Sequence, residues 1–208
     1  MREQPYRQNL LLRSSYSLIA PLYDTAIERT TRRARKQSLR ALPAEAGKHI
    51  LISGVGTGLD LPLLPTVHRY TALDFNPAML SRAKLRSEKL EVGFVLGDSM
   101  ALPFADAQFD HVVLHLITAV VSEPQRCLSE AARVLKPGGS IILFDKFLQP
   151  RQRAPLRRLF NIVTRRFVTR MDVVFEEVLR AAPELQVVSD VPLLGNGWFR
   201  GIVLRKPQ

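Results

Sequence analysis

The chain has 208 residues, of which 46% are hydrophobic, and Lys and Arg exceed Asp and Glu to give a formal net charge of +11. This length and hydrophobicity suffice to bury the core of one domain, which excludes general disorder. A single cysteine, Cys127, excludes an intramolecular disulfide and a cysteine metal cluster, and no apolar stretch reaches the roughly twenty residues that span a bilayer. We therefore expect a cytoplasmic protein that holds no metal and whose basic surface attracts polyanions or anionic lipid.

The chain begins with a segment of helical character. Apolar residues recur at helical spacing through residues 8–42, interrupted at Pro21, and this pattern predicts two helices, the second over residues 23–42. We expect residues 1–44 to form a lid over the rest of the domain. Tyr23 is a candidate catalytic residue because its ring can contact a cation, although packing between the lid and a sheet accounts for it equally well.

A short apolar strand then runs directly into three glycines at alternate positions. Residues 50–58 read ILISGVGTG, which places Gly54, Gly56 and Gly58 in the turn after the strand. Glycine adopts positive φ without strain and lets a ligand approach the main chain closely. Because the spacing is G-x-G-x-G rather than G-x-G-x-x-G, the turn does not match the usual site for the pyrophosphate of a dinucleotide.

The next predicted strand ends in an acid. Asp74 closes the strand over residues 69–74 and lies twenty positions after Gly54. In nucleotide-binding α/β sheets a carboxylate at this position accepts hydrogen bonds from the ribose hydroxyls. Strand, glycine turn and acid together therefore predict a nucleoside-like ligand, with Asp74 on its ribose and Phe75 beside it.

The chain continues with alternating strands and helices. This alternation predicts a doubly wound α/β fold, in which a mostly parallel sheet carries helices on both faces. The predicted strands cover residues 49–53, 69–74, 91–96, 110–116 and 140–145, and the predicted helices cover 58–64, 77–89 and 124–135. Asn76 and Pro77, and later Pro124, are typical first residues of helices.

A basic amphipathic helix is predicted after the fifth strand. Over residues 156–171 apolar side chains follow one helical face, and five arginines occupy the remainder. Such a helix can lie on an anionic membrane, with its apolar face in the headgroup boundary and its arginines on phosphates. Alternatively, its apolar stripe belongs to the core and the arginines are solvated. Both interpretations remain open.

Two further motifs resemble a known family. Residues 97–104, GDSMALPF, followed by Phe109 and Asp110, resemble a stretch of the class I S-adenosylmethionine (SAM) methyltransferases, and residues 131–139, AARVLKPGG, are similar to the helix and turn before the fifth strand of that family. The resemblance implies a seven-stranded sheet, SAM as cofactor and a contact of Asp98 with the adenine. The predicted SAM-binding residues are Ser53, Gly54, Gly56, Gly58, Asp74, Phe75, Asp98, Ser99 and His115.

Within this superfamily the chain looks most like the soluble bacterial phosphatidylethanolamine N-methyltransferases. The likeness lies in residues 16–24, in residues 116–124 and in the arginine-rich insertion. It implies one domain over residues 1–208, in which a SAM-binding core at 45–147 is followed by the basic helix and a closing hairpin at 148–208. The implied reaction is methylation of a lipid amine, such as that of phosphatidylethanolamine, by an enzyme in peripheral contact with an anionic membrane.

Other acceptors stay open, because quinone and other small-molecule methyltransferases share most of these motifs. Ile52 stands where family members usually carry an acid that holds the methionine ammonium, so a SAM-binding protein without catalysis is a third alternative. Nucleic acid is disfavoured, since residues 114–117 read LHLI in place of the Asp/Asn-Pro-Pro-aromatic motif of many base methyltransferases. The sequence does not predict the oligomeric state.

His115 is the candidate general base of the core. It lies at the predicted C-terminal end of the fourth strand, where open α/β sheets collect their ligands. An amine acceptor must lose a proton before it attacks, and a phenol or enol needs a base even more. The alternative is a histidine whose ring is satisfied by backbone hydrogen bonds beneath the lid.

Overall fold

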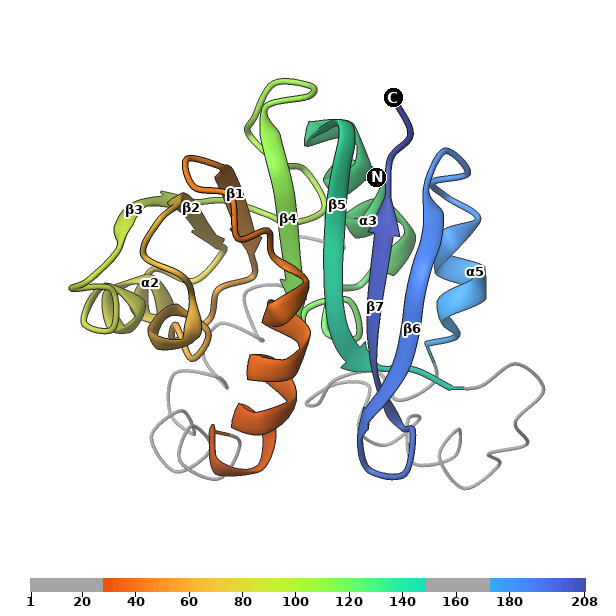
Figure 1. The fold of residues 1–208 in the computed structure, drawn as a ribbon, viewed down its shortest axis with the longest axis horizontal. Coiled ribbons are helices and arrows are strands. Elements are labelled where there is room, and N and C mark those ends of the chain that lie inside the picture. Colours follow the sequence, from red (N-terminus) through yellow and green to blue (C-terminus); the bar gives the residue numbers. More distant parts are fainter. Residues whose placement is uncertain (1–27, 149–172) are drawn as a thin grey trace, which may run out of the picture.

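The computed structural model describes residues 28–148 and 173–208, which form a seven-stranded sheet with the strand order β3-β2-β1-β4-β5-β7-β6 (Figure 1). Strands β1 to β5 pair in parallel, and β7 runs antiparallel to both of its neighbours, β5 and β6. The strands are β1 (His49–Ser53), β2 (Arg69–Asp74), β3 (Glu91–Leu96), β4 (Phe109–His115), β5 (Leu135–Lys146), β6 (Gln186–Leu194) and β7 (Phe199–Arg205). The mostly parallel sheet and the closing hairpin of the prediction are confirmed.

Helices cover both faces of this sheet, as the nearly continuous apolar runs of its central strands require, such as residues 50–52 and 112–114. On one face Ile50 and Ile52 belong to a cluster that includes residues of the 3-10 helix η1 (Leu39–Ala41) and of α2 (Pro77–Lys84). On the other face Leu51 belongs to a cluster with α3 (Pro124–Val134) and α5 (Phe175–Leu179). A helix over residues 28–38 leads into η1 and lies below the ends of β1 and β4 in the view of Figure 1.

The predicted helix starts are confirmed. At α2 the Asn76 side chain accepts a hydrogen bond from the backbone N–H of Ala78, and Pro77 occupies the first turn. At α3, Pro124 is the first helical residue. However, α2 ends at Lys84 and not at residue 89, and the Ser87 hydroxyl donates to the Lys84 carbonyl just after this end.

The helix predicted over residues 58–64 is wrong. This segment contains only the 3-10 helix η2 (Leu61–Leu63), preceded and followed by turns. Gly58 has φ +83° and Pro62 lies inside the segment, so an α-helix cannot run through it. The leucines that imitate a helical pattern instead pack a compact turn against the sheet.

The first or last residues of two strands also differ from the prediction. β4 ends at His115, because Leu116 leaves the strand with φ +57°. β5 begins at Leu135, five residues earlier than predicted, since Leu135 already pairs with Phe109 before the register shifts and Ser140 pairs with His111. The helix-to-strand turn predicted near residues 136–139 is therefore an irregularity inside a longer strand.

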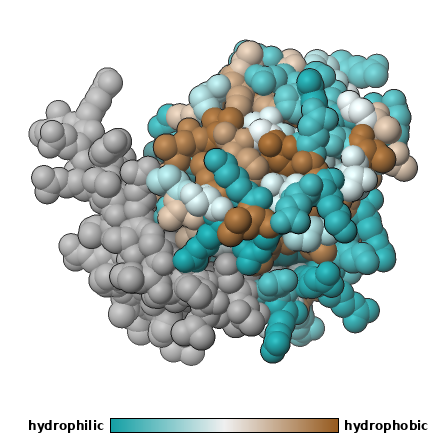
Figure 2. Space-filling view, turned by 90° about the vertical axis from the view of Figure 1, so that its left-hand side faces the viewer, coloured by the Kyte–Doolittle hydropathy of each residue, from teal (hydrophilic) through white to brown (hydrophobic). Residues whose placement is uncertain are grey.

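Some predictions fall outside the described residues: the first lid helix, Tyr23 and the basic helix over residues 156–171. Among the described residues, no helix is long and apolar enough to cross a membrane. The side of the molecule at the β3 edge mixes hydrophobic and hydrophilic side chains (Figure 2), and the exposed apolar side chains of the chain include Leu85 after α2 and Leu96 at the end of β3.

Candidate active site

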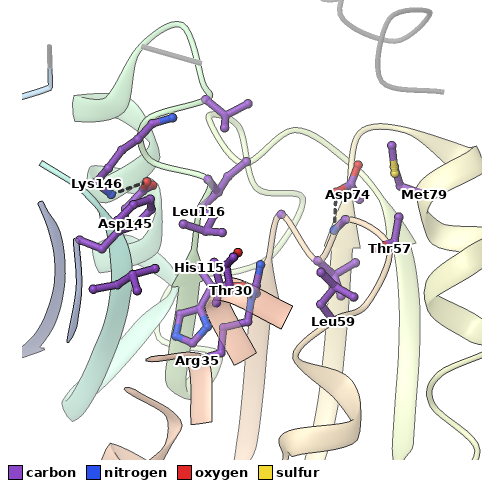
Figure 3. Close-up of a pocket in the computed structure, with 18 of the residues that line it drawn as sticks. Thr30, Arg35, Thr57, Leu59, Asp74, Met79, His115, Leu116, Asp145 and Lys146 are labelled. Atoms are coloured by element: carbon purple, nitrogen blue, oxygen red, sulfur yellow. Dashed lines mark hydrogen bonds between the residues drawn. The ribbon is translucent and has the colours of Figure 1, made fainter. Parts of the chain in front are cut away.

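A cavity of about 500 Å³ lies at the C-terminal edge of the parallel strands. The turn after β1 and the ends of β2, β4 and β5 contribute to its wall, together with the helix over residues 28–38 and the hairpin between β6 and β7. Figure 3 shows Asp74 and Met79 at one end of this cavity, Asp145 and Lys146 at the other, and His115 and Arg35 between them. This is the edge at which open α/β sheets bind their ligands.

Glycine is needed at the three positions of the turn for different structural reasons. All have positive φ, but a Cβ on Gly54 would lie 2.6 Å from a side-chain carbon of Ile117, and one on Gly58 would lie 2.8 Å from the Cα of Ala83 in α2. Gly56 has φ +56° and no atom within 4 Å of such a Cβ. Gly54 and Gly56 line the cavity, so Gly56 is where bare main chain is open to a ligand, whereas Gly58 allows α2 to pack closely.

Asp74 is fixed by the turn beside it. Its Oδ2 accepts a hydrogen bond from the Gly56 N–H at 2.8 Å, and its Oδ1 accepts one from the Asn76 N–H at 2.9 Å (Figure 3). Burial raises the pKa of the Asp74 carboxyl, and the backbone N–H groups oppose this shift only in part. Asp74 and Phe75 both line the cavity. The predicted ribose acceptor is thus joined to the glycine turn in one unit.

Four of the predicted SAM-binding residues are not among those that line the cavity: Ser53, Gly58, Asp98 and Ser99. The Ser53 hydroxyl donates to the Ser99 Oγ at 2.8 Å, which ties the end of β1 to the loop after β3. Asp98 Oδ1 accepts from the Met100 N–H at 2.8 Å. The contacts predicted for these four residues with SAM remain predictions.

His115 lines the cavity, but its ring is held by side chains and not by the backbone hydrogen bonds of the alternative interpretation. Its Nδ1 lies 3.0 Å from Asp60 Oδ1, and its Nε2 lies 3.1 Å from Ser38 Oγ. A carboxylate can only accept, so in the neutral ring Nδ1 carries the hydrogen and Nε2 accepts from the Ser38 hydroxyl. His115 is therefore oriented from both sides.

Asp60 also binds Arg35. The Arg35 Nη1 donates to Asp60 Oδ2 at 2.9 Å, and its Nε donates to Thr31 Oγ1 at 3.0 Å. Burial alone would raise the pKa of Asp60, but the adjacent Arg35 charge and His115 hold this pKa well below its usual range. Asp60 is thus an ionised, buried carboxylate that joins the helix over residues 28–38 to the end of β4.

The sequence reasoning missed this network. One signal was present: Thr31, Arg35 and Ser38 recur four and three residues apart in a predicted helix, which places three polar side chains on the face that packs against the sheet. Asp60 gave no comparable signal, since it stands alone in an apolar turn. Ile52, which stands where family members usually carry an acid, is 1% exposed and belongs to the apolar cluster of the same face.

The opposite end of the cavity is built from β5 and the loop after β4. Asp145 Oδ2 accepts from the Ala119 N–H at 2.9 Å and Oδ1 accepts from the Lys146 N–H at 2.8 Å. Burial raises the pKa of Asp145 to about 6 and lowers the pKa of Lys146. Ionisable side chains here face an apolar wall contributed by Leu116, Ile117, Val120, Leu194 and Phe199.

Sequence and fold comparisons agree with this geometry. Residues 51–143 match the family model described as a methyltransferase domain. In fold the chain is similar to the methyltransferase bound to the Trm112 methyltransferase activator of Haloferax volcanii, with a TM-score of 0.77 and 20% identity over 95% of this chain and 98% of that one. The glycine turn open at Gly56 and the carboxylate of Asp74 fit an adenosyl ligand. The chain belongs to the class I SAM-dependent methyltransferases.

Two relatives differ in how far they match. A phosphatidylethanolamine N-methyltransferase from Cereibacter sphaeroides is 33% identical over 185 residues, which are 86% of this chain and 89% of the relative. A demethylmenaquinone methyltransferase from Renibacterium salmoninarum is 36% identical over 132 residues, which are 61% of this chain and 55% of the relative. The first similarity extends over nearly the whole of both proteins, whereas the second is confined to a shared part.

Proposed function

We propose that this enzyme transfers the methyl group of SAM to the amine of a lipid such as phosphatidylethanolamine at an anionic membrane surface. The observation that carries the proposal is the similarity to a phosphatidylethanolamine N-methyltransferase over 86% of this chain and 89% of the relative. Core motifs are shared by methyltransferases of many acceptors, so similarity beyond the core bears more directly on the acceptor.

The end of the cavity at β1 and β2 is assigned to the adenosyl group. There Asp74 would accept from the ribose hydroxyls, and the open main chain of Gly56 would lie against the ligand. The adenine contact of Asp98 is assigned from the family resemblance alone, because Asp98 is not among the residues that line the cavity. SAM would supply a methyl group on a sulfonium: the acceptor lone pair would bond to the methyl carbon in line as the C–S bond breaks, and S-adenosylhomocysteine would leave. Positioning the acceptor in near-attack geometry can account for about 7–11 kcal/mol of the barrier.

The end at β4 and β5 is assigned to the acceptor. Its apolar wall suits the glycerol and first acyl carbons of a lipid, and the Asp145 carboxylate suits an ammonium group. An ammonium must lose a proton before it attacks, and we assign this proton to His115 Nε2, which is the free acceptor of the ring once Ser38 rotates away. The cation contact predicted for Tyr23 lies outside the described residues and stays a prediction.

The test is a product analysis. Purified protein is incubated with methyl-labelled SAM and vesicles of phosphatidylethanolamine with phosphatidylglycerol, and the extracted lipids are identified by mass spectrometry. We expect monomethylated phosphatidylethanolamine. Absence of labelled lipid, with SAM turnover on another acceptor, would refute the proposal for the acceptor while leaving the enzyme class intact.

A second candidate is a small apolar acceptor such as a quinone or phenol. It is favoured by the apolar cavity wall and by the demethylmenaquinone methyltransferase among the relatives. Demethylmenaquinone in detergent therefore forms the second arm of the same experiment. Saturable SAM binding without turnover in either arm would favour the third alternative, a SAM-binding protein without catalysis.

A further inference from the structure

The helix over residues 28–38 and the 3-10 helix after it carry two opposite stripes of side chains. The buried stripe comprises Thr31, Ala34, Arg35 and Ser38, and it holds the network around His115. The exposed stripe is cationic and comprises Arg29, Arg32, Arg33, Lys36 and Arg40, which lie at the first position and three, four, seven and eleven positions further. At about 100° per residue these five side chains share one side of the helix.

In the part of the chain that the structure describes, none of the five side chains of this cationic stripe has a carboxylate within ion-pair distance. Elsewhere the protein pairs such groups readily, for instance Arg133 with Glu130 and Asp106. Five unpaired charges along three helical turns repel one another, and a helix retains such a row at a cost that a polyanionic partner removes.

We propose that this cationic stripe is a docking surface for an anionic lipid bilayer. A row of long cationic side chains on a straight helix can contact a flat array of phosphates simultaneously. The stripe contains no aromatic side chain, so it offers no platform on which the bases of single-stranded nucleic acid stack. It is also distant in sequence from the predicted basic helix over residues 156–171, and it is carried by an element that packs on the sheet.

The position of the stripe relates membrane docking to the proposed reaction. Thr30, Thr31 and Arg35 line the cavity from the same helix, so the stripe lies on the outer side of a helix whose inner side forms part of the cavity wall. A bilayer in contact with the stripe therefore lies against the helix that borders the cavity. The link between docking and methylation rests on the proposed function, because only a lipid acceptor requires the enzyme to be at a bilayer. Docking itself can be measured without turnover.

The experiment compares two triple variants of the full chain with equal loss of charge. The stripe variant is Arg29→Gln/Arg33→Gln/Lys36→Gln. The control is Lys89→Gln/Arg180→Gln/Arg205→Gln, whose side chains are exposed and lie outside the stripe. Arg205 ends β7 at the sheet edge opposite the cavity, where β7 pairs with the early part of β5. Circular dichroism verifies that both variants are folded.

Binding is measured by flotation with vesicles of equal parts phosphatidylglycerol and phosphatidylcholine, and with pure phosphatidylcholine. Since each cation near the surface contributes about 1 kcal/mol, we expect the stripe variant to lose about two orders of magnitude in partition coefficient and the control to lose less than tenfold. Wild-type binding should weaken with salt. Equal losses in the two variants, unchanged binding of the stripe variant, or wild-type binding to oligonucleotides in place of vesicles would each overturn the proposal.

Failure of the proposed function gives a different result. A short-chain phosphatidylethanolamine dissolved as monomers serves as acceptor without a bilayer, and on it the stripe variant should match wild type within twofold. If wild type methylates neither this lipid nor phosphatidylethanolamine vesicles yet binds anionic vesicles through the stripe, the docking surface stands and the acceptor is wrong. If it methylates the monomer and the stripe variant still binds vesicles normally, the acceptor stands and the docking surface is wrong.

Discussion

The two ends of the cavity differ in whether main chain or side chains form the surface. At the end formed by β1 and β2, main chain makes the surface: Gly56 is bare, and Asp74 is held by backbone N–H groups. At the end formed by β4 and β5, side chains from segments far apart in sequence make it, such as Asp145, Lys146 and Phe199. A ligand common to a family suits the first kind of surface, whereas an acceptor that varies between enzymes suits the second.

His115 lies between these ends, and the largest expected effect concerns the network that holds it. Asp60→Asn removes the charge that balances buried Arg35, and leaving one partner of a buried ion pair typically costs about 3–5 kcal/mol. Urea unfolding of wild type and variant measures this loss. A double variant, Asp60→Leu/Arg35→Met, removes both charges and should recover much of the stability; if it is less stable than Asp60→Asn alone, the ion pair is not the cause.

Asp145 allows a test of the acceptor end by pH. Because burial raises its pKa from 3.8 to about 6, the folded state holds the proton more tightly than the unfolded state. The resulting stabilisation is complete below about pH 4 and disappears as the pH rises through about 6, with an amplitude of about 3 kcal/mol. Unfolding measured from pH 4 to 7 should show this decrease for wild type and lack it for Asp145→Asn.

The same ionisation predicts an activity profile under the proposed function. An ammonium acceptor needs the charged form of Asp145, so methylation of phosphatidylethanolamine should decline as the pH falls below about 6. A quinone or phenol has no cation to bind at this position, and its methylation should show no such dependence on Asp145. A decline that persists in Asp145→Asn would assign the titration to another group.

Asp74→Ala tests the opposite end. Loss of a charged hydrogen-bond acceptor for the ribose should raise the dissociation constant of SAM ten- to a hundredfold, on the order of 1.5–3 kcal/mol. Isothermal titration calorimetry measures the constant directly. Asp145→Ala is the matched control, since it removes a buried carboxylate from the same cavity without touching the adenosyl end, and it should bind SAM within about threefold of wild type.

The sequence predicts the features that neighbouring residues determine and misses those that depend on residues far apart in the chain. The bounds of β1, β2 and β3 agree with the prediction because each is a short apolar run between turns, and α2 and α3 start where a cap and a proline require it. The partners of His115 could not be read in this way, since Asp60 and Ser38 lie 55 and 77 positions away. The false helix over residues 58–64 arose because leucines that fill a turn share the spacing of a helix.

The smallest effect separates two glycines that look alike in sequence. Gly58→Ala forces a methyl group against the backbone of α2, so it should lower the free energy of unfolding by about 2 kcal/mol or more through overpacking and the strain of positive φ. Gly56→Ala meets no atom and carries only the strain, about 1–2 kcal/mol, but the residue lines the cavity assigned to SAM. Denaturant unfolding and SAM titration on both variants should therefore give opposite rankings: Gly58→Ala less stable, Gly56→Ala weaker in binding. Equal SAM affinity of the two folded variants would mean that the ligand does not approach the main chain at Gly56, and the division of the cavity into two ends would have to be redrawn.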